Sequence, residues 1–481
     1  MLAVALSSGR LSFALPAWFV PFLGLRYLQT NPNPVKTRLF RLAAVTWVAL
    51  SASWYGATPL WGVPHFVFMA LNAAFTVLPF AVYLWLRRHL GTRFWTTLLF
   101  AAATVAIEWL TIGGSPFGSF GAGAYSQFGF LALLQFLSVG GMLAITFLIS
   151  WTGAVADWAV EARTTDRRFA AGLAVWAAVL VAIVGWGALR LASAPTASQD
   201  SRILAAGLTA KEVSMHELMP LLEEDLDEFR DRTAAVHREY LQRSRTAAEA
   251  GVDLIVWPEL AGTGTFADVA VLLERSAEFA DTYDLHLAVP TMEIDPEGTR
   301  TPVNQVSLFG PDGSLLARHV KFGGNFMEGT LAGEPEITIV DTALGRIGLA
   351  VCWDFDFDRI VAEAGKDAVD LLIVPAADWE GIDPLHGRMA VFRAIENGTT
   401  LVRQAQNGLS VIADPYGRVI DTGSGPDNAI EATVSGASVA TLYPRVTNVV
   451  GLMATVIVVV SAALAFFRRK SRESGRTDEP A

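Results

Sequence analysis

The chain has 481 residues, of which 52% are hydrophobic and only 17% are charged. An ordinary soluble domain carries about 25% charged residues, so the composition argues against a purely cytosolic protein. The length suffices for several domains with large buried cores. Disordered and collagen-like chains are excluded by the abundance of apolar residues, and a disulfide scaffold is excluded because Cys352 is the only cysteine.

The net charge of −11 is unevenly distributed along the chain. Residues 1–192 hold 12 Lys and Arg against 4 Asp and Glu, and residues 468–481 hold 5 against 3, which leaves 19 against 40 in residues 193–467. A strongly acidic region repels phosphate backbones, so nucleic acid is excluded as a partner. The basic ends and the acidic middle indicate two different environments within one chain.

Apolar runs long enough to cross about 30 Å of hydrocarbon predict membrane-spanning helices. They lie at 43–62, 65–86, 95–112, 130–156, 170–192 and 447–467. Arg10 and Pro16 interrupt the first thirty residues, which predict either one span or a hairpin of two short ones. A cleaved signal peptide would not account for the further runs. We therefore expect a transmembrane bundle of six or seven spans over residues 1–192 and a C-terminal span at 447–467.

Basic residues in alternate gaps between the runs predict the orientation of the chain. The basic clusters are Lys36/Arg38/Arg41, Arg87/Arg88/Arg93, Arg163/Arg167/Arg168 and Arg468/Arg469/Lys470. The gap at 113–128 holds no Lys or Arg. The positive-inside rule puts the basic gaps in the cytoplasm, so residues 193–446 are predicted to lie outside and 468–481 to form a basic cytoplasmic tail.

Residues 193–446 have the pattern of a water-soluble α/β domain. Strands are predicted at 202–207, 252–257, 285–289, 303–309, 346–351, 371–374 and 400–403, and a long acidic amphipathic helix at 213–250. The alternation of strands and helices is typical of layered α/β folds. Runs such as 254–257 and 347–351 are apolar throughout, as strands buried on both faces are.

Two polar side chains follow predicted strands, at the edge where ligands usually bind in α/β sheets. Cys352 is either a small buried core residue or a nucleophile, and a nucleophilic thiol needs a base or a positive field beside it. Glu259 is a candidate base. Lys321, which follows a turn at 311–313, is a candidate for stabilising an oxyanion. Taken singly, Glu259 is better explained as a solvated loop acid and Lys321 as a surface cation.

Glutamate, lysine and cysteine in this chain order resemble the catalytic set of the nitrilase superfamily. The resemblance spans about 202–433 and is carried by Trp257-Pro258-Glu259 and by the segments 316–321, 345–354, 375–381, 393–398, 407–410 and 414–417. The placement of this domain between a helical bundle and one final helix is similar to the superfamily's apolipoprotein N-acyltransferase branch. Glu108-Trp109 and the predicted external loop segments 115–118 and 123–127 are also similar to that branch.

The resemblance implies a polytopic α-helical membrane bundle plus an extracytoplasmic α/β domain, a nitrilase-like αββα sandwich. It implies that Glu259 deprotonates Cys352, which takes a fatty acyl chain from a phospholipid as a thioester, while Lys321 stabilises the oxyanion. The acceptor would be the N-terminal amine of a diacylglyceryl-cysteine lipoprotein, with no metal or other cofactor. The implied setting is the bacterial cytoplasmic (inner) membrane, with a monomeric enzyme whose catalytic domain is periplasmic. Supporting or substrate-binding roles are implied for Glu328, Trp353, Asp354, Trp379 and Glu108.

Two other functions remain open. The chain departs from the branch's usual pattern at 322–325, at Trp353-Asp354 and at Leu385-His386, which keeps open a membrane-tethered carbon-nitrogen hydrolase of amidase or nitrilase type with water as the acceptor. The third function is a non-enzymatic binding domain, which the presence of all three candidate catalytic residues disfavours. Apolar loops at 113–130 and 322–331 favour acyl transfer, because an acyl chain needs an apolar path to the thiol.

Overall fold

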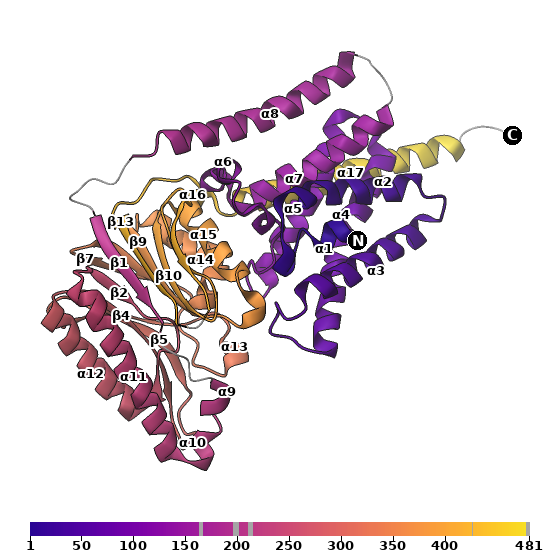
Figure 1. Cartoon of the computed structure of the whole chain (residues 1–481). Helices are drawn as coiled ribbons and strands as arrows, with labels where there is room; N and C mark the ends of the chain where they lie inside the picture. Colours follow the sequence, from indigo (N-terminus) through magenta and orange to yellow (C-terminus); the bar gives the residue numbers. More distant parts are fainter. Residues whose placement is uncertain (163–166, 196–201, 210–214, 426, 478–481) are drawn as a thin grey trace. The chain divides into compact units, whose positions relative to one another are not determined.

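A computed structural model describes residues 1–162, 167–195, 202–209, 215–425 and 427–477. The chain forms two compact units, which we call the helical unit and the α/β unit (Figure 1). The helical unit comprises Met1–Ser115, Gly121–Ala192 and Val446–Ala481, and the α/β unit comprises Pro116–Phe120 and Ser193–Arg445. The short segment Pro116–Phe120 therefore packs with the α/β unit, although its neighbours along the chain belong to the helical unit.

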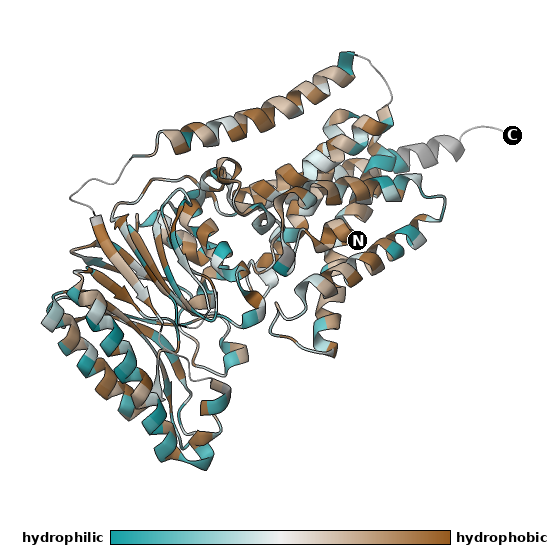
Figure 2. Ribbon diagram, viewed as in Figure 1, coloured by the Kyte–Doolittle hydropathy of each residue, from teal (hydrophilic) through white to brown (hydrophobic). Residues whose placement is uncertain are grey.

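The helical unit is built from helices joined by short turns. They are α1 (Leu2–Ala5), η1 (Gly9–Leu11), α2 (Ala14–Thr30), α3 (Val35–Trp54), α4 (Val63–Leu90), η2 (Phe94–Thr96), α5 (Thr97–Gly114), η3 (Gly123–Gln127), α6 (Leu131–Leu134), α7 (Leu137–Ala162), α8 (Arg167–Ala192) and α17 (Val449–Thr477). Within the described residues, five helices are long and apolar enough to cross a membrane: Val63–Leu90, Phe94–Gly114, Leu137–Ala162, Arg167–Ala192 and Tyr443–Arg469. Figure 2 shows that α4, α7 and α8 are largely hydrophobic. The chain is a multi-pass membrane protein.

The helices near the N-terminus differ from the prediction. The expected helix over 43–62 is displaced to Val35–Trp54 and ends there, because Gly56 takes a left-handed φ of 79° and Pro59 has no amide hydrogen. The first thirty residues form neither alternative in full, since a one-turn α1 precedes the single 17-residue helix α2. Pro16 lies in the first turn of α2, where no intrahelical donor is lost. Since α2 and α3 are not among the five spanning helices, the count of six or seven spans stays a prediction.

The predicted helix over 130–156 is interrupted. It is divided between α6 and α7, and Gly141 inside α7 takes a φ of 64° and a ψ of −170°, which glycine tolerates and other residues rarely do. The runs at 65–86, 95–112, 170–192 and 447–467 are helical as predicted. Arg163, which belongs to one of the predicted cytoplasmic clusters, lies outside the described residues.

The α/β unit contains two β-sheets. In the described residues one sheet has the strand order β13-β1-β2-β4-β5-β6 with β3 paired to β4, and the other has the order β12-β11-β10-β9-β8-β7. The strands are β1 (Arg202–Leu208), β2 (Leu254–Val256), β3 (Gly262–Thr265), β4 (His286–Ile294), β5 (Val303–Phe309), β6 (Leu315–Val320), β7 (Thr338–Thr342), β8 (Gly345–Leu349), β9 (Leu371–Ala377), β10 (Thr400–Gln406), β11 (Ser410–Ala413), β12 (Val419–Gly423) and β13 (Ala429–Ser435). The helices are α9 (Met215–Leu218), α10 (Leu221–Glu224), α11 (Leu226–Glu249), α12 (Phe266–Tyr283), α13 (Asn325–Glu328), α14 (Asp358–Lys366), α15 (Leu385–Asn397) and α16 (Tyr443–Val446), with 3-10 turns η5 (Cys352–Asp356) and η6 (Glu380–Ile382).

Side-chain alternation along the strands explains the four layers of this unit. Leu254 and Val256 of β2 point into a core that they share with Ile347 and Leu349 of β8 in the facing sheet. Ile255, between them, packs on the opposite face in a core formed with α11 and α12. The second sheet is covered by α15, which contacts β10 and β11 (Figure 1). The predicted αββα sandwich is confirmed.

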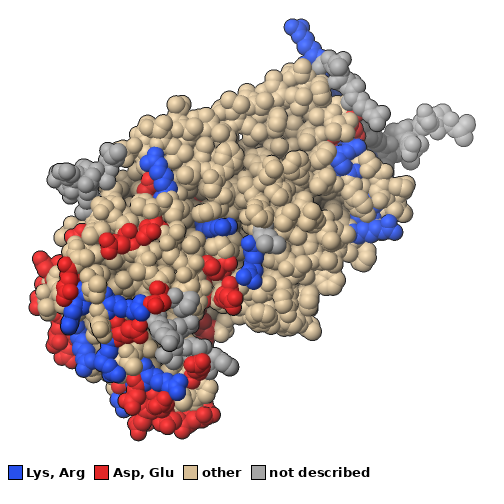
Figure 3. All heavy atoms as spheres, viewed as in Figure 1, with Lys and Arg blue, Asp and Glu red and all other residues tan. Residues whose placement is uncertain are grey.

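All seven predicted strands are present, as β1, β2, β4, β5, β8, β9 and β10. The single helix predicted over 213–250 is wrong: the chain forms α9, α10 and α11, with breaks at Pro220 and Asp225. Asp225 has an extended φ of −154° and its side chain accepts the Glu228 amide, so it begins α11 as an N-cap. Residues 213 and 214 lie outside the described residues. Figure 3 shows the acidic side chains gathered over the α/β unit, in agreement with the charge distribution of the sequence.

Candidate active site

Glu259 lies just beyond the carboxyl end of β2 and is almost fully buried, with 2% of the residue exposed. Its Oε1 accepts hydrogen bonds from Lys321 Nζ at 2.7 Å and from Asn304 Nδ2 at 2.7 Å. Its Oε2 accepts the backbone amide of Ala377, at the end of β9 in the facing sheet, at 2.8 Å. These contacts hold a carboxylate firmly between the two sheets, where a base can be aimed at a substrate.

Lys321 follows β6 and is 1% exposed. The β5–β6 hairpin positions it through a tight turn in which the Gly313 amide donates to the Gly310 carbonyl. Its Nζ donates to Glu259 and to Glu328. Burial alone would lower the pKa of Lys321, but the negative charges of Glu259, of the Cys352 sulfur once it has lost its proton, and of Glu328 outweigh burial and raise the pKa. Lys321 is therefore a permanent buried cation.

Glu328 ends the one-turn helix α13 and is the most accessible of the charged groups around Lys321, with 27% of its side chain exposed. It accepts a hydrogen bond from Lys321 and lies 3.4 Å from Asn304 Nδ2. Burial raises the pKa of Glu328, Lys321 opposes that shift and Glu259 reinforces it. Glu328 thus helps to hold the ammonium group of Lys321 in place.

Cys352 lies three residues beyond the end of β8 and opens η5 with a left-handed φ of 47°, which is uncommon for a residue with a side chain. Such strain is typical of functional positions. The Sγ atom lies 4.0 Å from the carbonyl oxygen of Ala377, and the residue is 6% exposed. Burial first, and then the charge of Glu259, raise the pKa of Cys352 to about 11, while Lys321 and His386 oppose the shift. The thiol is therefore protonated at neutral pH and needs a base during attack.

Asp354 is fully buried and braces the turn that carries Cys352. Its Oδ1 accepts the amides of Phe322 at 3.1 Å and Gly323 at 2.7 Å, just after Lys321. Its Oδ2 accepts the Val351 amide at 2.8 Å and lies 2.9 Å from His319 Nε2. Every contact of Asp354 is internal, so it ties the lysine loop to the cysteine turn.

Four aromatic rings form a row beside the cysteine turn. Phe326, 61% exposed, packs against Phe117 with ring centroids 5.6 Å apart. Phe117 packs on Trp353 at 5.6 Å, and Trp353 on Trp379 at 6.1 Å. The row therefore leads from the surface of the α/β unit to the residue after Cys352, and offers an apolar wall.

Phe117 is held in the row by its neighbours in the segment Pro116–Phe120. The Ser119 amide donates to the Asp356 carbonyl at 2.7 Å. Gly118 has a φ of 54°, and a Cβ at this position would lie 2.4 Å from the same carbonyl oxygen, so only glycine fits. The sequence therefore fixes this segment against η5.

Comparison with known proteins shows which families these residues are similar to. The family model described as "Carbon-nitrogen hydrolase" matches residues 212–442. The chain is 28% identical to an apolipoprotein N-acyltransferase of Bradyrhizobium diazoefficiens over 87% of this chain and 81% of that protein, and 26% identical to one of Geobacter metallireducens over 96% and 94%. Among solved structures, Nit3 of Saccharomyces cerevisiae, a member of branch 10 of the nitrilase superfamily, is 18% identical with a TM-score of 0.39, over 50% of this chain and 93% of that one.

The residues that match the carbon-nitrogen hydrolase model, 212–442, make up just under half of the chain. The named relatives support an enzyme of the nitrilase superfamily, and the same chain carries helices long and apolar enough to cross a membrane. The carbon-nitrogen hydrolase domain brings Glu259, Lys321, Cys352 and Glu328 to one site, together with Trp353 and Asp354. Trp379 reaches that site through Trp353.

Glu108 belongs to the helical unit, in α5, and the other candidate residues belong to the α/β unit. Its Oε1 accepts the Gly123 amide at 2.9 Å, and its Oε2 is buried without a hydrogen-bond partner among the described residues. A role for Glu108 in the reaction stays a prediction.

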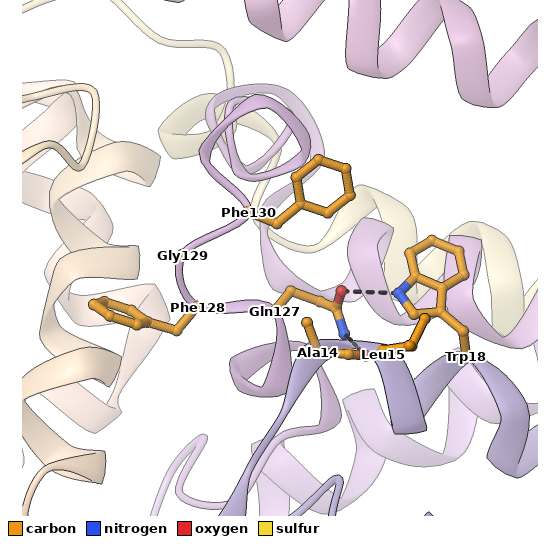
Figure 4. Close-up of a pocket in the computed structure, with 7 residues that line it drawn as sticks. All are labelled: Ala14, Leu15, Trp18, Gln127, Phe128, Gly129 and Phe130. Atoms are coloured by element: carbon orange, nitrogen blue, oxygen red, sulfur yellow. Dashed lines mark hydrogen bonds between the residues drawn. The ribbon is translucent and has the colours of Figure 1, made fainter.

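The helical unit also contains an apolar pocket of about 440 Å³ (Figure 4). It is lined by Ala14, Leu15, Trp18, Gln127, Phe128, Gly129 and Phe130. Gln127 holds its two sides together, because its side-chain oxygen accepts Trp18 Nε1 at 2.9 Å and its amide donates to the Ala14 carbonyl at 3.1 Å. None of the predicted site residues lines this pocket.

The sequence-based prediction missed Asn304, His386 and Asp378. Asn304 lies in β5 and donates hydrogen bonds to both Glu259 and Glu328. The sequence signal for this residue is the presence of polar side chains between the apolar neighbours Val303 and Val306. Polar atoms of Cys352, His386 and Asp378 lie within 4.8 Å of one another, which is close to the spacing of metal ligands. Asp378 is already paired with Arg403 and His386, however. Its contacts are therefore those of an ion-pair network.

The carbon-nitrogen hydrolase domain therefore combines a protonated thiol, a buried carboxylate and a permanent cation. A carboxylate that takes the thiol proton as sulfur attacks a carbonyl makes a nucleophile without a preformed thiolate. A fixed ammonium can offset the negative charge that develops on the carbonyl oxygen. The arrangement can carry out acyl substitution through a thioester.

Proposed function

We propose that the enzyme transfers a fatty acyl chain from a phospholipid to the N-terminal amine of a diacylglyceryl-cysteine lipoprotein. The names of its relatives and their similarity over 87–96% of the chain support this proposal. The observation that carries it is the aromatic row of Phe326, Phe117, Trp353 and Trp379, because an acyl chain needs an apolar path between a surface and the thiol.

In the first half-reaction Glu259 takes the proton from Cys352 as its sulfur attacks the ester carbonyl of the phospholipid. A carbon–sulfur bond forms, and the carbonyl oxygen becomes an oxyanion next to the Lys321 ammonium. The tetrahedral intermediate collapses with cleavage of the ester carbon–oxygen bond. Glu259 returns its proton to the departing lysophospholipid oxygen, and the acyl chain remains on Cys352 as a thioester.

In the second half-reaction the lipoprotein amine attacks the thioester carbonyl. Glu259 takes a proton from the attacking nitrogen, a carbon–nitrogen bond forms, and the carbon–sulfur bond breaks. The proton passes to the departing sulfur, which restores the thiol. Lys321 faces an oxyanion in both half-reactions, so one cation serves two transition states, and Glu328 and Asn304 keep the ammonium and the base in position.

The orientation in the membrane follows from the basic clusters between the helices. We infer that the α/β unit is extracytoplasmic, on the periplasmic side of the inner membrane, because the positive-inside rule assigns those clusters to the cytoplasm. The catalytic domain then corresponds to residues 193–446, between the helices of 1–192 and the final span at 447–467. Tethering the thiol to the bilayer raises its effective concentration towards two lipid substrates.

The test is to incubate the purified full-length protein with phospholipid and to look by mass spectrometry for an acyl adduct on Cys352. The expected adduct is released by hydroxylamine and passes to the amine of an added diacylglyceryl lipopeptide. Cys352→Ala is the control, because it removes the sulfur while leaving Glu259 and Lys321 paired. Transfer by Cys352→Ala would contradict the proposal.

The second candidate function is a membrane-tethered carbon-nitrogen hydrolase with water as the acceptor. The observation that favours it is the accessibility of Glu328, whose side chain is 27% exposed beside Lys321 and so gives water a route to the site. An adduct that forms on Cys352 and is lost only to water, or turnover of small amides without an adduct from phospholipid, would support the hydrolase.

A further inference from the structure

His386 places a second cationic side chain beside Cys352, and the chemistry described above does not use it. It lies in the first turn of α15 and is 3% exposed. One ring nitrogen lies within 4.8 Å of both the Cys352 sulfur and an Asp378 carboxylate oxygen. Lys321 approaches the same sulfur from a different element, the β6 edge, so the sulfur has two separate cations near it.

The ring of His386 is anchored on one side only. Its Nδ1 lies 2.8 Å from Asp378 Oδ1. Arg403 Nη2 donates to both oxygens of Asp378, at 2.8 and 2.9 Å, and its Nη1 donates to the Leu409 carbonyl. The Arg403 and Asp378 side chains are each 1% exposed, so the anchor is rigid and dry.

The other ring nitrogen of His386, Nε2, faces Asp356 at a distance too long for a good hydrogen bond. Among the described residues Nε2 has no hydrogen-bond partner, and neither has Asp356 Oδ2, which lies 3.5 Å away. Both atoms are buried, and a buried polar atom without a partner is costly, which indicates that a partner arrives during the reaction. With Asp378 on one nitrogen and Asp356 near the other, the ring is favoured in its protonated, donating form.

We propose that His386 is a positioning residue that donates its Nε2 hydrogen to the Cys352 sulfur whenever that sulfur carries negative charge. This occurs twice in a thioester mechanism, when the thiol loses its proton during attack and when sulfur departs from the thioester. The inference rests on Cys352 being the nucleophile and holds for an amine or a water acceptor.

The charges around the sulfur support separate roles for Lys321 and His386. Lys321 is already shared between Glu259 and Glu328, so much of its charge is offset before a substrate arrives. The charged groups that face His386 are Asp356 from η5, Asp378 after β9 and Arg403 from β10. Burial alone would lower the pKa of His386, but Asp356 and Asp378 raise it well above its usual value. With a neutral side chain at position 386, the negative charges around the sulfur would outnumber the positive charges.

Two substitutions separate a role at the sulfur from a role in folding. His386→Asn retains a donor that can reach Asp378, so it keeps the anchor and loses the second ring nitrogen, which the proposal assigns to the sulfur. His386→Gln places an uncharged donor near the position of Nε2. His237→Gln is the matched control, because His237 is another buried imidazole of the α/β unit, 2.9 Å from the Thr263 carbonyl.

The experiment measures the rate at which iodoacetamide alkylates Cys352 between pH 6 and 10.5, by intact mass spectrometry of the full chain in detergent. For His386→Asn we expect alkylation at pH 8 to be about tenfold slower, with the profile moved up by about one pH unit. His386→Gln is expected to fall between the wild type and His386→Asn, and His237→Gln to match the wild type.

An unchanged pH profile in His386→Asn would overturn the inference, as would an equal displacement in His237→Gln. Thermal unfolding of each variant identifies loss of fold. If His386→Asn does not fold, the pH profile of His386→Gln is the test, and an unchanged profile in that variant would overturn the inference. Alkylation needs neither phospholipid nor lipoprotein. A displaced pH profile without acyl transfer would therefore refute the proposed function and leave the role of His386 intact. Acyl transfer with an unchanged pH profile would refute the role of His386 and leave the proposed function intact.

Discussion

Glu259 and Cys352 are connected through a single residue, Ala377. The Ala377 amide donates to Glu259 Oε2 at 2.8 Å, and its carbonyl oxygen lies 4.0 Å from the Cys352 sulfur. Ala377 ends β9, which pairs in parallel with β8, the strand that leads to Cys352. The base and the nucleophile thus belong to different sheets, and the end of one strand sets their separation.

Glu259→Gln is expected to make Cys352 ionise more readily and yet to slow acyl transfer. Burial and then the charge of Glu259 raise the pKa of Cys352 to about 11, so removal of that charge lowers the pKa. Alkylation of Cys352 at pH 8 is expected to quicken by about tenfold for each pKa unit. Acyl transfer is expected to slow by about 10²- to 10⁴-fold, because the proton acceptor is lost. Slower alkylation in this variant, measured by mass spectrometry, would show that Glu259 does not act on the sulfur.

Glu328→Gln and Glu328→Ala are expected to differ. The glutamine can still accept a hydrogen bond from Lys321, so it should retain most activity. The alanine removes a hydrogen bond to a charged donor, worth about 1.5–3 kcal/mol, which corresponds to a roughly 10- to 100-fold fall in kcat. Steady-state kinetics with a lipopeptide acceptor test this order, and equal losses in both variants would argue that the charge of Glu328, and not its contact, matters.

Asp354→Ala is expected to destabilise the α/β unit as well as to abolish transfer. It leaves three buried amides and His319 without their shared acceptor, at about 1–3 kcal/mol for each unsatisfied group. The melting temperature should fall by several degrees. Asp341→Asn is the control, because Asp341 pairs with Arg346 with 77% of its side chain exposed and should change little. A normal melting temperature for Asp354→Ala would contradict the bracing role.

Phe117→Ala is expected to act on long acyl donors selectively. Removing this ring opens a gap between Phe326 and Trp353, and burial of such a side chain is worth about 1.5–3 kcal/mol. The KM for long-chain phospholipids should rise by about tenfold or more, whereas a short, water-soluble ester donor should be little affected. Equal changes for both donors would show that the row does not bind the chain.

Asp378→Asn is expected to lose stability in a pH-dependent way. Burial alone would raise the pKa of Asp378, but Arg403 and His386 outweigh it and lower the pKa to about 2. A carboxylate with a lowered pKa stabilises the fold above its unfolded value, near 4, and that contribution is lost as the pH falls towards 2. The melting temperatures of the wild type and the variant should therefore differ at pH 6 and converge towards pH 2. A constant difference would contradict the ion pair.

The strands that the sequence predicted are mostly long apolar strands that are buried on both faces. β2 and β8 carry apolar residues at consecutive positions, which a single sequence displays openly. Six of the described strands were missed. β6, β7, β12 and β13 are partly exposed. β3 and β11 are buried but only four residues long, and glycine, threonine or serine interrupts their apolar pattern. β13 alternates buried and exposed residues with small and polar side chains that turns also use.

The predicted site shows the same limit. Glu259, Lys321 and Cys352 could be predicted because each stands at the end of a strand or hairpin within a motif. His386 could not, because its role arises only when α15 packs beside η5 and brings the ring to the Cys352 sulfur. Asn304 has a weaker signal, a polar residue within an apolar strand, and its contact with Glu259 forms only when the strands of their sheet pair. These contacts join residues 34 and 45 positions apart, so neighbouring residues do not reveal them.

The segment Pro116–Phe120 limits how far this enzyme can be divided. A gene fragment coding for residues 193–445 would encode every acid, base and nucleophile of the site, yet its product would lack Phe117 and the Ser119 amide that holds η5. Residues 193–445 alone therefore lack part of the structure around the site. A chimera that exchanges the α/β unit between relatives has to include the matching segment of the loop after α5.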